Sequence, residues 1–86
     1  MRPKQSQPVN KMPYLLVIDD KKPTLAELQG LVKGFIEVLY LEGNKQLIVN
    51  EEGLLLGLEP NEPASMLAGT LIVGNAVMLE GKALLT

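Results

Sequence analysis

The 86-residue sequence contains no cysteine, no histidine and no tryptophan. Without cysteine it cannot form disulfides, and without histidine as well it lacks the thiolate and imidazole ligands of structural zinc sites. Only 3% of its residues are aromatic, namely Tyr14, Phe35 and Tyr40. A domain this small, with neither covalent nor metal cross-links, must be stabilised by packing and association, and its core must be aliphatic.

Basic residues are scarce outside the N-terminus. Positions 13–86 hold five lysines and ten acidic residues, a net charge of −5, although the whole chain carries −2. Nucleic-acid binding normally requires a concentration of Lys and Arg, so we expect no nucleic-acid partner. Positions 37–62 hold six glutamates against Lys45 alone, which favours a basic protein surface as partner. The alternative is a solvated surface that keeps a leucine-rich protein soluble.

Long hydrophobic runs are also missing. No apolar run approaches the roughly 18 residues that span a bilayer, and the N-terminus lacks the apolar centre of a signal peptide. We therefore expect a cytoplasmic protein without membrane contact. Residues 1–12 (MRPKQSQPVNKM) contain two prolines and no periodic apolar pattern, which predicts a flexible N-terminal tail. Residues 13–86 are then a single domain.

The first part of this domain predicts a strand followed by a helix. Residues 14–18 (YLLVI) form a short apolar run, as expected of a strand covered on both faces. Thr24 and Glu27 fit a capping box, and apolar residues at spacings of three and four follow them. The helix is expected to end at Gly34 in the left-handed conformation.

Residues 35–58 predict three consecutive antiparallel strands. Strands at 35–41 and 46–49 are joined by a Glu-Gly-Asn-Lys turn, and a strand at 54–58 follows an Asn-Glu-Glu-Gly turn. Adjacent strand residues point to opposite faces, so the leucine triplet at 54–56 would make both faces apolar. One face then needs another layer, which predicts a homodimer. Cover by a helix or strand of the same monomer is the alternative.

The last part predicts a short helix and a final apolar segment. Asn61 is a suitable cap for a helix at 64–68, and residues 70–79 are apolar except at Gly74-Asn75, which suggests a bulge or a close backbone approach. Residues 83–85 are expected to add an edge strand. The predicted fold is α+β: a mainly antiparallel sheet of four or five strands, one main helix packed on a face and a short second helix.

The sequence offers little for catalysis. Its two serines have no recognisable base nearby, and the adjacent acids Asp19-Asp20 and Glu51-Glu52 would point apart at a strand end. Neither the spacing of a calcium loop nor a phosphate-binding glycine loop is present. We therefore predict no enzyme activity, no cofactor and no metal site.

Two kinds of binding site are predicted instead. One is an acidic, leucine-backed surface around the Asn-Glu-Glu-Gly turn, which would bind a protein. The other is a shallow pocket of exposed backbone amides that would take a small ligand such as a nucleotide; turns and helix caps are the structural alternative for its residues. The candidate residues are Glu51, Glu52, Gly53, Gly57, Glu59, Asn61, Gly74 and Asn75.

Three stretches occur in order within residues 14–79: LAELQGLVKGFIEVLYL, LIVNEEGLLLGLEPNEPASMLAG and LIVGNAVML. Over this range the sequence resembles a family of small domains of unknown function encoded by tailed bacteriophages and mobile elements. It departs from the pattern at Glu62-Pro63, where a basic or small residue is expected. The resemblance implies a phage accessory protein in the bacterial cytoplasm. It would bind a host protein in host takeover or anti-defence, or alternatively sequester a nucleotide immune signal.

Overall fold

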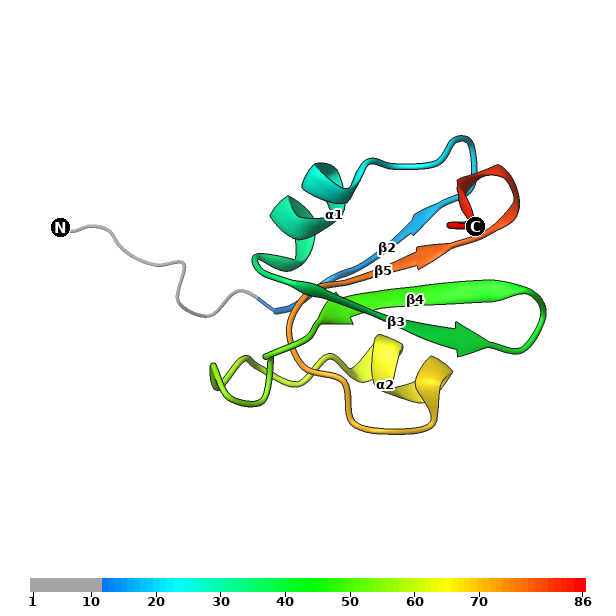
Figure 1. The fold of residues 1–86 in the computed structure, drawn as a ribbon. Coiled ribbons are helices and arrows are strands. Elements are labelled where there is room, and N and C mark those ends of the chain that lie inside the picture. Colours follow the sequence, from blue (N-terminus) through cyan, green and yellow to red (C-terminus); the bar gives the residue numbers. More distant parts are fainter. Residues whose placement is uncertain (1–11) are drawn as a thin grey trace, which may run out of the picture.

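The computed structural model describes residues 12–86, so the predicted tail at residues 1–12 falls outside this range apart from Met12. Neither helix of the described residues is long and apolar enough to cross a membrane. The elements, shown in Figure 1, are β2 (Leu15–Ile18), α1 (Leu25–Val32), β3 (Ile36–Leu41), β4 (Lys45–Asn50), α2 (Glu62–Ala68), β5 (Ala76–Leu79) and the 3-10 helix η2 (Gly81–Ala83).

Four strands form one sheet in the order β2-β5-β4-β3. The hairpin of β3 and β4 pairs Leu39 with Leu47, and β4 is also antiparallel to β5. β2 is parallel to β5, with Leu15 beside Ala76. The sheet is therefore mixed but mostly antiparallel, and the predicted α+β class is confirmed. β2 and β3 are its two edges.

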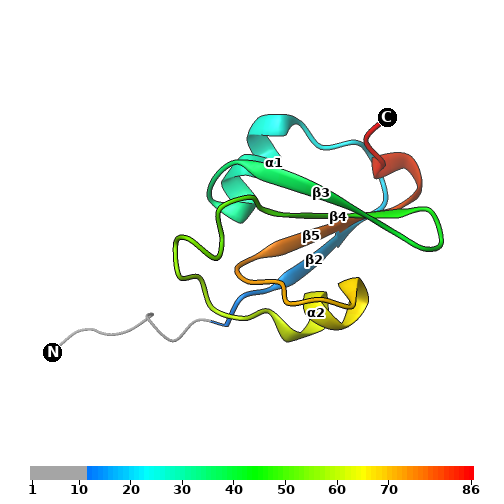
Figure 2. The ribbon, with the colours of Figure 1, turned by 60° about the horizontal axis from the view of Figure 1, so that its bottom comes forward.

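The sheet lies between the two helices, α1 on one face and α2 on the other (Figures 1 and 2). Successive residues of a strand point to opposite faces, and β5 is buried along its whole length. Two clusters result. The cluster under α1 contains Leu28, Val32, Ile48, Val77, Leu79 and Ala83, and the cluster on the α2 side contains Leu47, Val49, Ala64, Ile72, Ala76 and Met78.

The capping box predicted for α1 is present. The hydroxyl of Thr24 accepts a hydrogen bond from the amide of Glu27 at 3.1 Å, and the Glu27 carboxylate accepts one from the amide of Thr24 at 2.8 Å. The helix end differs from the prediction, because Lys33 and not Gly34 adopts the left-handed conformation, with φ of 66°. Gly34 instead allows a close contact: a Cβ there would lie 2.7 Å from Nδ2 of Asn50.

The second helix has the predicted cap and the predicted end, but it begins at Glu62, two residues before the predicted start. Oδ1 of Asn61 accepts a hydrogen bond from the amide of Ala64 at 3.1 Å, and Gly69 ends α2 in the left-handed conformation. The predicted hairpin turn between β3 and β4 is also confirmed. Gly43 and Asn44 both have positive φ there, and these two residue types tolerate that conformation best.

The strand at residues 14–18 is not covered on both faces, as its apolar run had predicted. β2 is an edge strand, and Leu16 and Val17 are 39% and 48% exposed. The prediction is wrong because composition indicates a strand but not its neighbours. Among the described strands β2 has only β5 beside it, and β5 and β4 take the inner positions of the sheet.

Two further predicted strand segments are wrong. Residues 70–73 contribute only an isolated bridge between Val73 and Pro60. Residues 83–85 form no strand, because the side chain of Gln46 takes the place of a neighbouring strand. Its Nε2 donates to the carbonyl of Leu85 at 2.8 Å, and its Oε1 accepts from the amide of Leu85 at 2.7 Å.

Candidate functional site

Residues 51–58 form a loop, and the third strand predicted at 54–58 is therefore wrong. Oδ1 of Asn50 accepts a hydrogen bond from the amide of Glu52 at 2.7 Å, and the Asn50 carbonyl accepts one from the amide of Gly53 at 3.2 Å. The amide of Leu58 donates back to the Gly53 carbonyl at 3.1 Å. Because these local bonds satisfy the backbone, the segment does not need a neighbouring strand.

Three of the four leucines of this loop point into solvent. Leu54, Leu55 and Leu56 are 72%, 87% and 57% exposed. The argument for a homodimer from a strand with two apolar faces no longer applies. What remains is an uncovered apolar surface at one end of the sheet, where the loop projects (Figures 1 and 2).

Two glycines hold the loop close to the rest of the domain. A Cβ on Gly53 would lie 2.7 Å from Cγ2 of Val73, and one on Gly74 would lie 2.6 Å from Cδ1 of Leu58. Gly74 also has φ of 80°. The close backbone approach predicted at Gly74 is confirmed, and the loop is packed tightly at both ends.

A cavity of about 470 Å³ lies between β3, this loop and residues 70–73, and we call it the acidic groove. The charged residues among the described ones that line it are all glutamates. Its exposed apolar residues come from the loop and from the segment before β5. The lining consists of Glu37, Leu39, Val49, Asn50, Glu51, Glu52, Gly53, Leu54, Leu55, Thr70, Leu71, Ile72 and Val73.

The negative charge of the acidic groove is not neutralised within the described part of the chain. Glu37, Glu51 and Glu52 are exposed, and the ion pair found in residues 12–86 lies elsewhere, between Lys45 and Glu80 at 3.5 Å. No group of three acidic side chains within that range could hold a metal ion. The groove therefore presents separate carboxylates beside leucines, an arrangement that attracts cationic side chains with aliphatic stems.

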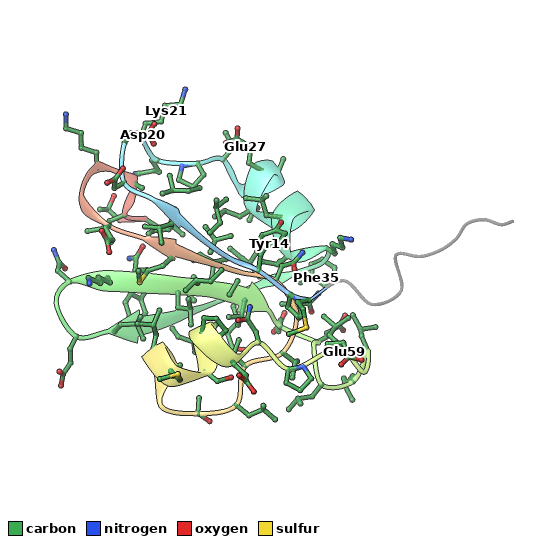
Figure 3. The ribbon with its side chains drawn as sticks, turned by 180° about the vertical axis from the view of Figure 1, so that it is seen from behind. Tyr14, Asp20, Lys21, Glu27, Phe35 and Glu59 are labelled. Carbon is green, nitrogen blue, oxygen red and sulfur yellow. The ribbon has the colours of Figure 1, made fainter. Side chains whose placement is uncertain are left out.

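A second cavity, of about 350 Å³, collects three other candidate residues, Glu59, Gly74 and Asn75. Tyr14 also lines it, and Figure 3 shows Tyr14 and Glu59 near the end of the sheet where residue 12 lies. The amide of Asn75 is already used: its Nδ2 donates to the carbonyl of Leu31 at 3.1 Å, and its Oδ1 accepts from the amide of Tyr14 at 3.3 Å.

Asn61 and Gly57 line neither of these cavities. Asn61 is 1% exposed; its Nδ2 donates to the carbonyls of Tyr14 and Gly74 at 3.0 and 2.8 Å, and its Oδ1 caps α2. Both donors and the acceptor of this side chain are thus occupied. The role that the structure gives Asn61 is a link between β2, α2 and the segment before β5.

A third cavity, of about 480 Å³, lies between α1 and β2. It has an apolar floor that includes Ile18, Ala26 and Gly30, and a Cβ on Gly30 would meet nothing within 4 Å. Gly30 therefore does not pack closely against the sheet. The charged residues around this cavity are of both signs: Asp20, Lys21 and Glu27 (Figure 3).

The acidic groove brings Glu51, Glu52 and Gly53 of the predicted site together with residues that were not predicted to belong to it, among them Glu37, Leu39 and Leu71. Glu37 carried a signal, because it interrupts an otherwise apolar strand. Leu71 showed no such signal in the sequence, since it comes to line the groove only because the chain after α2 returns to this part of the fold.

Neither a curated protein nor a solved structure matches this chain. A model of a domain of unknown function matches residues 6–83, which include every strand and both α-helices described above. The chain accordingly belongs to the family described as Domain of unknown function (DUF3846).

Proposed function

We propose that this protein works by binding, without chemistry of its own, and that its acidic groove takes a basic segment of another protein. One observation carries the proposal: Glu37, Glu51 and Glu52 line the same groove as the exposed Leu54, Leu55 and Leu71, while the described lining residues include no Lys or Arg.

The two kinds of side chain have different roles in such binding. Carboxylates on an exposed surface mainly speed encounter with a cationic partner and set its orientation. Leucines supply affinity, because binding removes their apolar surface from water. A basic partner with apolar residues would use both.

As the partner we propose a host bacterial protein, with the protein acting in the cytoplasm as a phage accessory factor in host takeover or anti-defence. The support is the sequence's resemblance to domains encoded by phages and mobile elements, together with the acidic surface. A homodimer also remains a proposal, now motivated by the exposed leucines of the loop. Light scattering at several concentrations tests it directly.

The test of the binding function is a comparison of two charge reversals of equal size. Tagged wild type, Glu51→Lys/Glu52→Lys and Asp19→Lys/Asp20→Lys are each used to capture proteins from bacterial lysate. Captured proteins are identified by mass spectrometry, purified and titrated against all three forms by calorimetry. All four carboxylates are exposed, so both variants are expected to fold.

We expect one defined protein to bind the wild type and the variant at positions 19 and 20 with similar affinity. The variant at positions 51 and 52 should bind it at least tenfold more weakly, since opposed charges become like charges. Equal binding by all three forms would remove the acidic groove as the site.

Sequestration of a nucleotide signal is the second proposal, and the cavity beside Glu59, Gly74 and Asn75 is its only structural support among the described residues. Because the Asn75 amide is already paired, a ligand would depend on backbone groups. A thermal-shift screen against cyclic nucleotides tests it, because ligand at 100 times its Kd adds about 2.7 kcal/mol of stability. No shift at millimolar ligand would reject it.

A further inference from the structure

The outer edge of β3 is unpaired among the described residues. β4 pairs with one side of β3, and no other described strand lies on the opposite side. In an antiparallel pair, alternate residues direct both backbone groups at the partner strand. The amide of Glu51 donates to the carbonyl of Phe35 at 2.8 Å, which sets this alternation. Ile36, Val38 and Tyr40 therefore direct their N–H and C=O groups away from the sheet.

This edge borders the acidic groove directly. Glu37 and Leu39 belong both to β3 and to the lining of the groove. A peptide that paired with the outward backbone groups would extend the sheet by one strand, a recurrent mode of peptide recognition. One face of the added strand would lie over the groove, and the other would continue the face on which Ile36 and Val38 pack toward α1.

The charges decide which kind of strand fits. A second copy of β3, paired about the middle of the strand, would bring its own Glu37 close to the first and place two acidic grooves side by side, and like charges across strands destabilise pairing. Lys or Arg over the groove would instead meet Glu37, Glu51 and Glu52 with their charged ends and the exposed leucines with their stems.

We propose that the outer edge of β3 takes an extended segment of another protein as a fifth strand, antiparallel to β3, with basic side chains facing the acidic groove and apolar side chains alternating with them. The alternation follows from strand geometry, because only every second side chain faces the groove. The apolar positions would lie beside Ile36, Val38 and Tyr40. This inference rests on the proposed function and specifies its partner as an extended basic-apolar segment.

The geometry also says which amides of the peptide bond to β3. Directly opposed residues of an antiparallel pair have side chains on the same face. The peptide residues that bond to Ile36, Val38 and Tyr40 are therefore its apolar ones. The amides of its basic residues point away from β3 into solvent.

The test uses a blocked peptide of alternating lysine and valine, as long as β3, and two N-methylated forms. One form is methylated at the valine amides, the other at the lysine amides. Affinity for the full chain is measured by calorimetry, and amide hydrogen exchange of the protein is followed by NMR. A peptide of the same composition, with its lysines and valines in two blocks, controls for charge alone.

We expect the alternating peptide to bind and to slow exchange of the Val38 and Tyr40 amides at least tenfold. Methylation at valine should weaken binding at least tenfold, since it removes the hydrogen bonds that the valine amides donate to β3, whereas methylation at lysine should change it less than threefold. Absence of binding, equal effects of the two methylations, or unchanged exchange at Val38 and Tyr40 would each overturn the inference.

These outcomes separate the inference from the proposed function. If the captured partner depends on Glu51 and Glu52 but leaves the exchange of Val38 and Tyr40 unchanged, the acidic groove binds protein without strand addition. If Glu51→Lys/Glu52→Lys has no effect on the partner and the peptide does not bind, both proposals fail.

Discussion

The two edges of the sheet differ in their surroundings. β2 has four residues and lies beside a cavity with charges of both signs. β3 has six residues and lies beside a groove whose described charged residues are all acidic. Both edges offer backbone groups that a further strand can use. Strand length and neighbouring charge, not unpaired backbone, therefore distinguish the two edges.

Each edge is also fastened by a buried asparagine. Asn61 holds the start of β2 through the carbonyl of Tyr14. On the β3 side, Nδ2 of Asn50 donates to the carbonyl of Val32 at 3.0 Å, while its Oδ1 begins the 51–58 loop. Both edges thus depend on a side-chain amide rather than on strand pairing alone.

The largest effect is expected on the β2 side. Asn61→Ala removes a helix cap and two hydrogen bonds from a buried site, and should lower the free energy of unfolding by about 3 kcal/mol. Urea denaturation measures this loss. Asn75→Ala, whose two bonds are less buried, should cost about 1 kcal/mol. Equal losses would mean that Asn61 is not the main fastening of this edge.

On the β3 side, the contact between Gly34 and Asn50 should make the stability effects of substituting the two residues non-additive. Gly34→Ala places a methyl group 2.7 Å from Nδ2 of Asn50 and should cost about 2 kcal/mol through overpacking. In an Asn50→Ala background the same change should cost less than about 1 kcal/mol. A double-mutant cycle by chemical denaturation checks this, and strictly additive losses would contradict the close contact.

The two edges should differ in how strongly a substitution there lowers affinity for the lysine-valine peptide. Glu37→Lys puts a like charge beside the basic peptide and should weaken the lysine-valine peptide about tenfold, or about 1.4 kcal/mol. Val17→Lys adds the same kind of charge at the exposed face of β2 and should leave affinity within twofold. Calorimetric titration compares the two variants. A larger loss of affinity for Val17→Lys would mean that the peptide binds at β2 and not at β3.

The smallest effect concerns the ion pair near the hairpin. Lys45 and Glu80 are 41% and 31% exposed, so their coupling energy in a double-mutant cycle should be about 0.3 kcal/mol and should fall further in 1 M salt. Coupling above about 1 kcal/mol would show that ion pairing contributes more to this sheet than the surface charges suggest.

Much of the fold could be predicted because its signals are local. The capping box at Thr24, the cap at Asn61 and the Gly43-Asn44 turn each depend on residues within a few positions of one another. These signals located both helices and the β3-β4 hairpin. Strand order and exposure carried no such signal, since the place of β2 at an edge depends on β5, far along the chain.

The candidate site was predicted only in part, for the same physical reason. Glu51 and Glu52 were found because acidic residues cluster there in sequence. The leucine triplet was assigned to a strand because local composition favours one, whereas the Asn50 side chain competes by bonding the Glu52 amide and starting a turn. Leu71 joins the groove only after the chain has passed through α2.

The position of β5 has a consequence for how the domain folds. This strand comes fourth along the chain but lies inside the sheet, where it joins β2 on one side to the β3-β4 hairpin on the other. Until it docks, no described strand pairs with both the hairpin and the first strand, and the pairing of β2 with β5 spans most of the chain. Completion of the sheet must therefore wait for its final strand, so in a nascent chain lacking residues 76–79 no pairing of the described strands would join β2 to the β3-β4 hairpin.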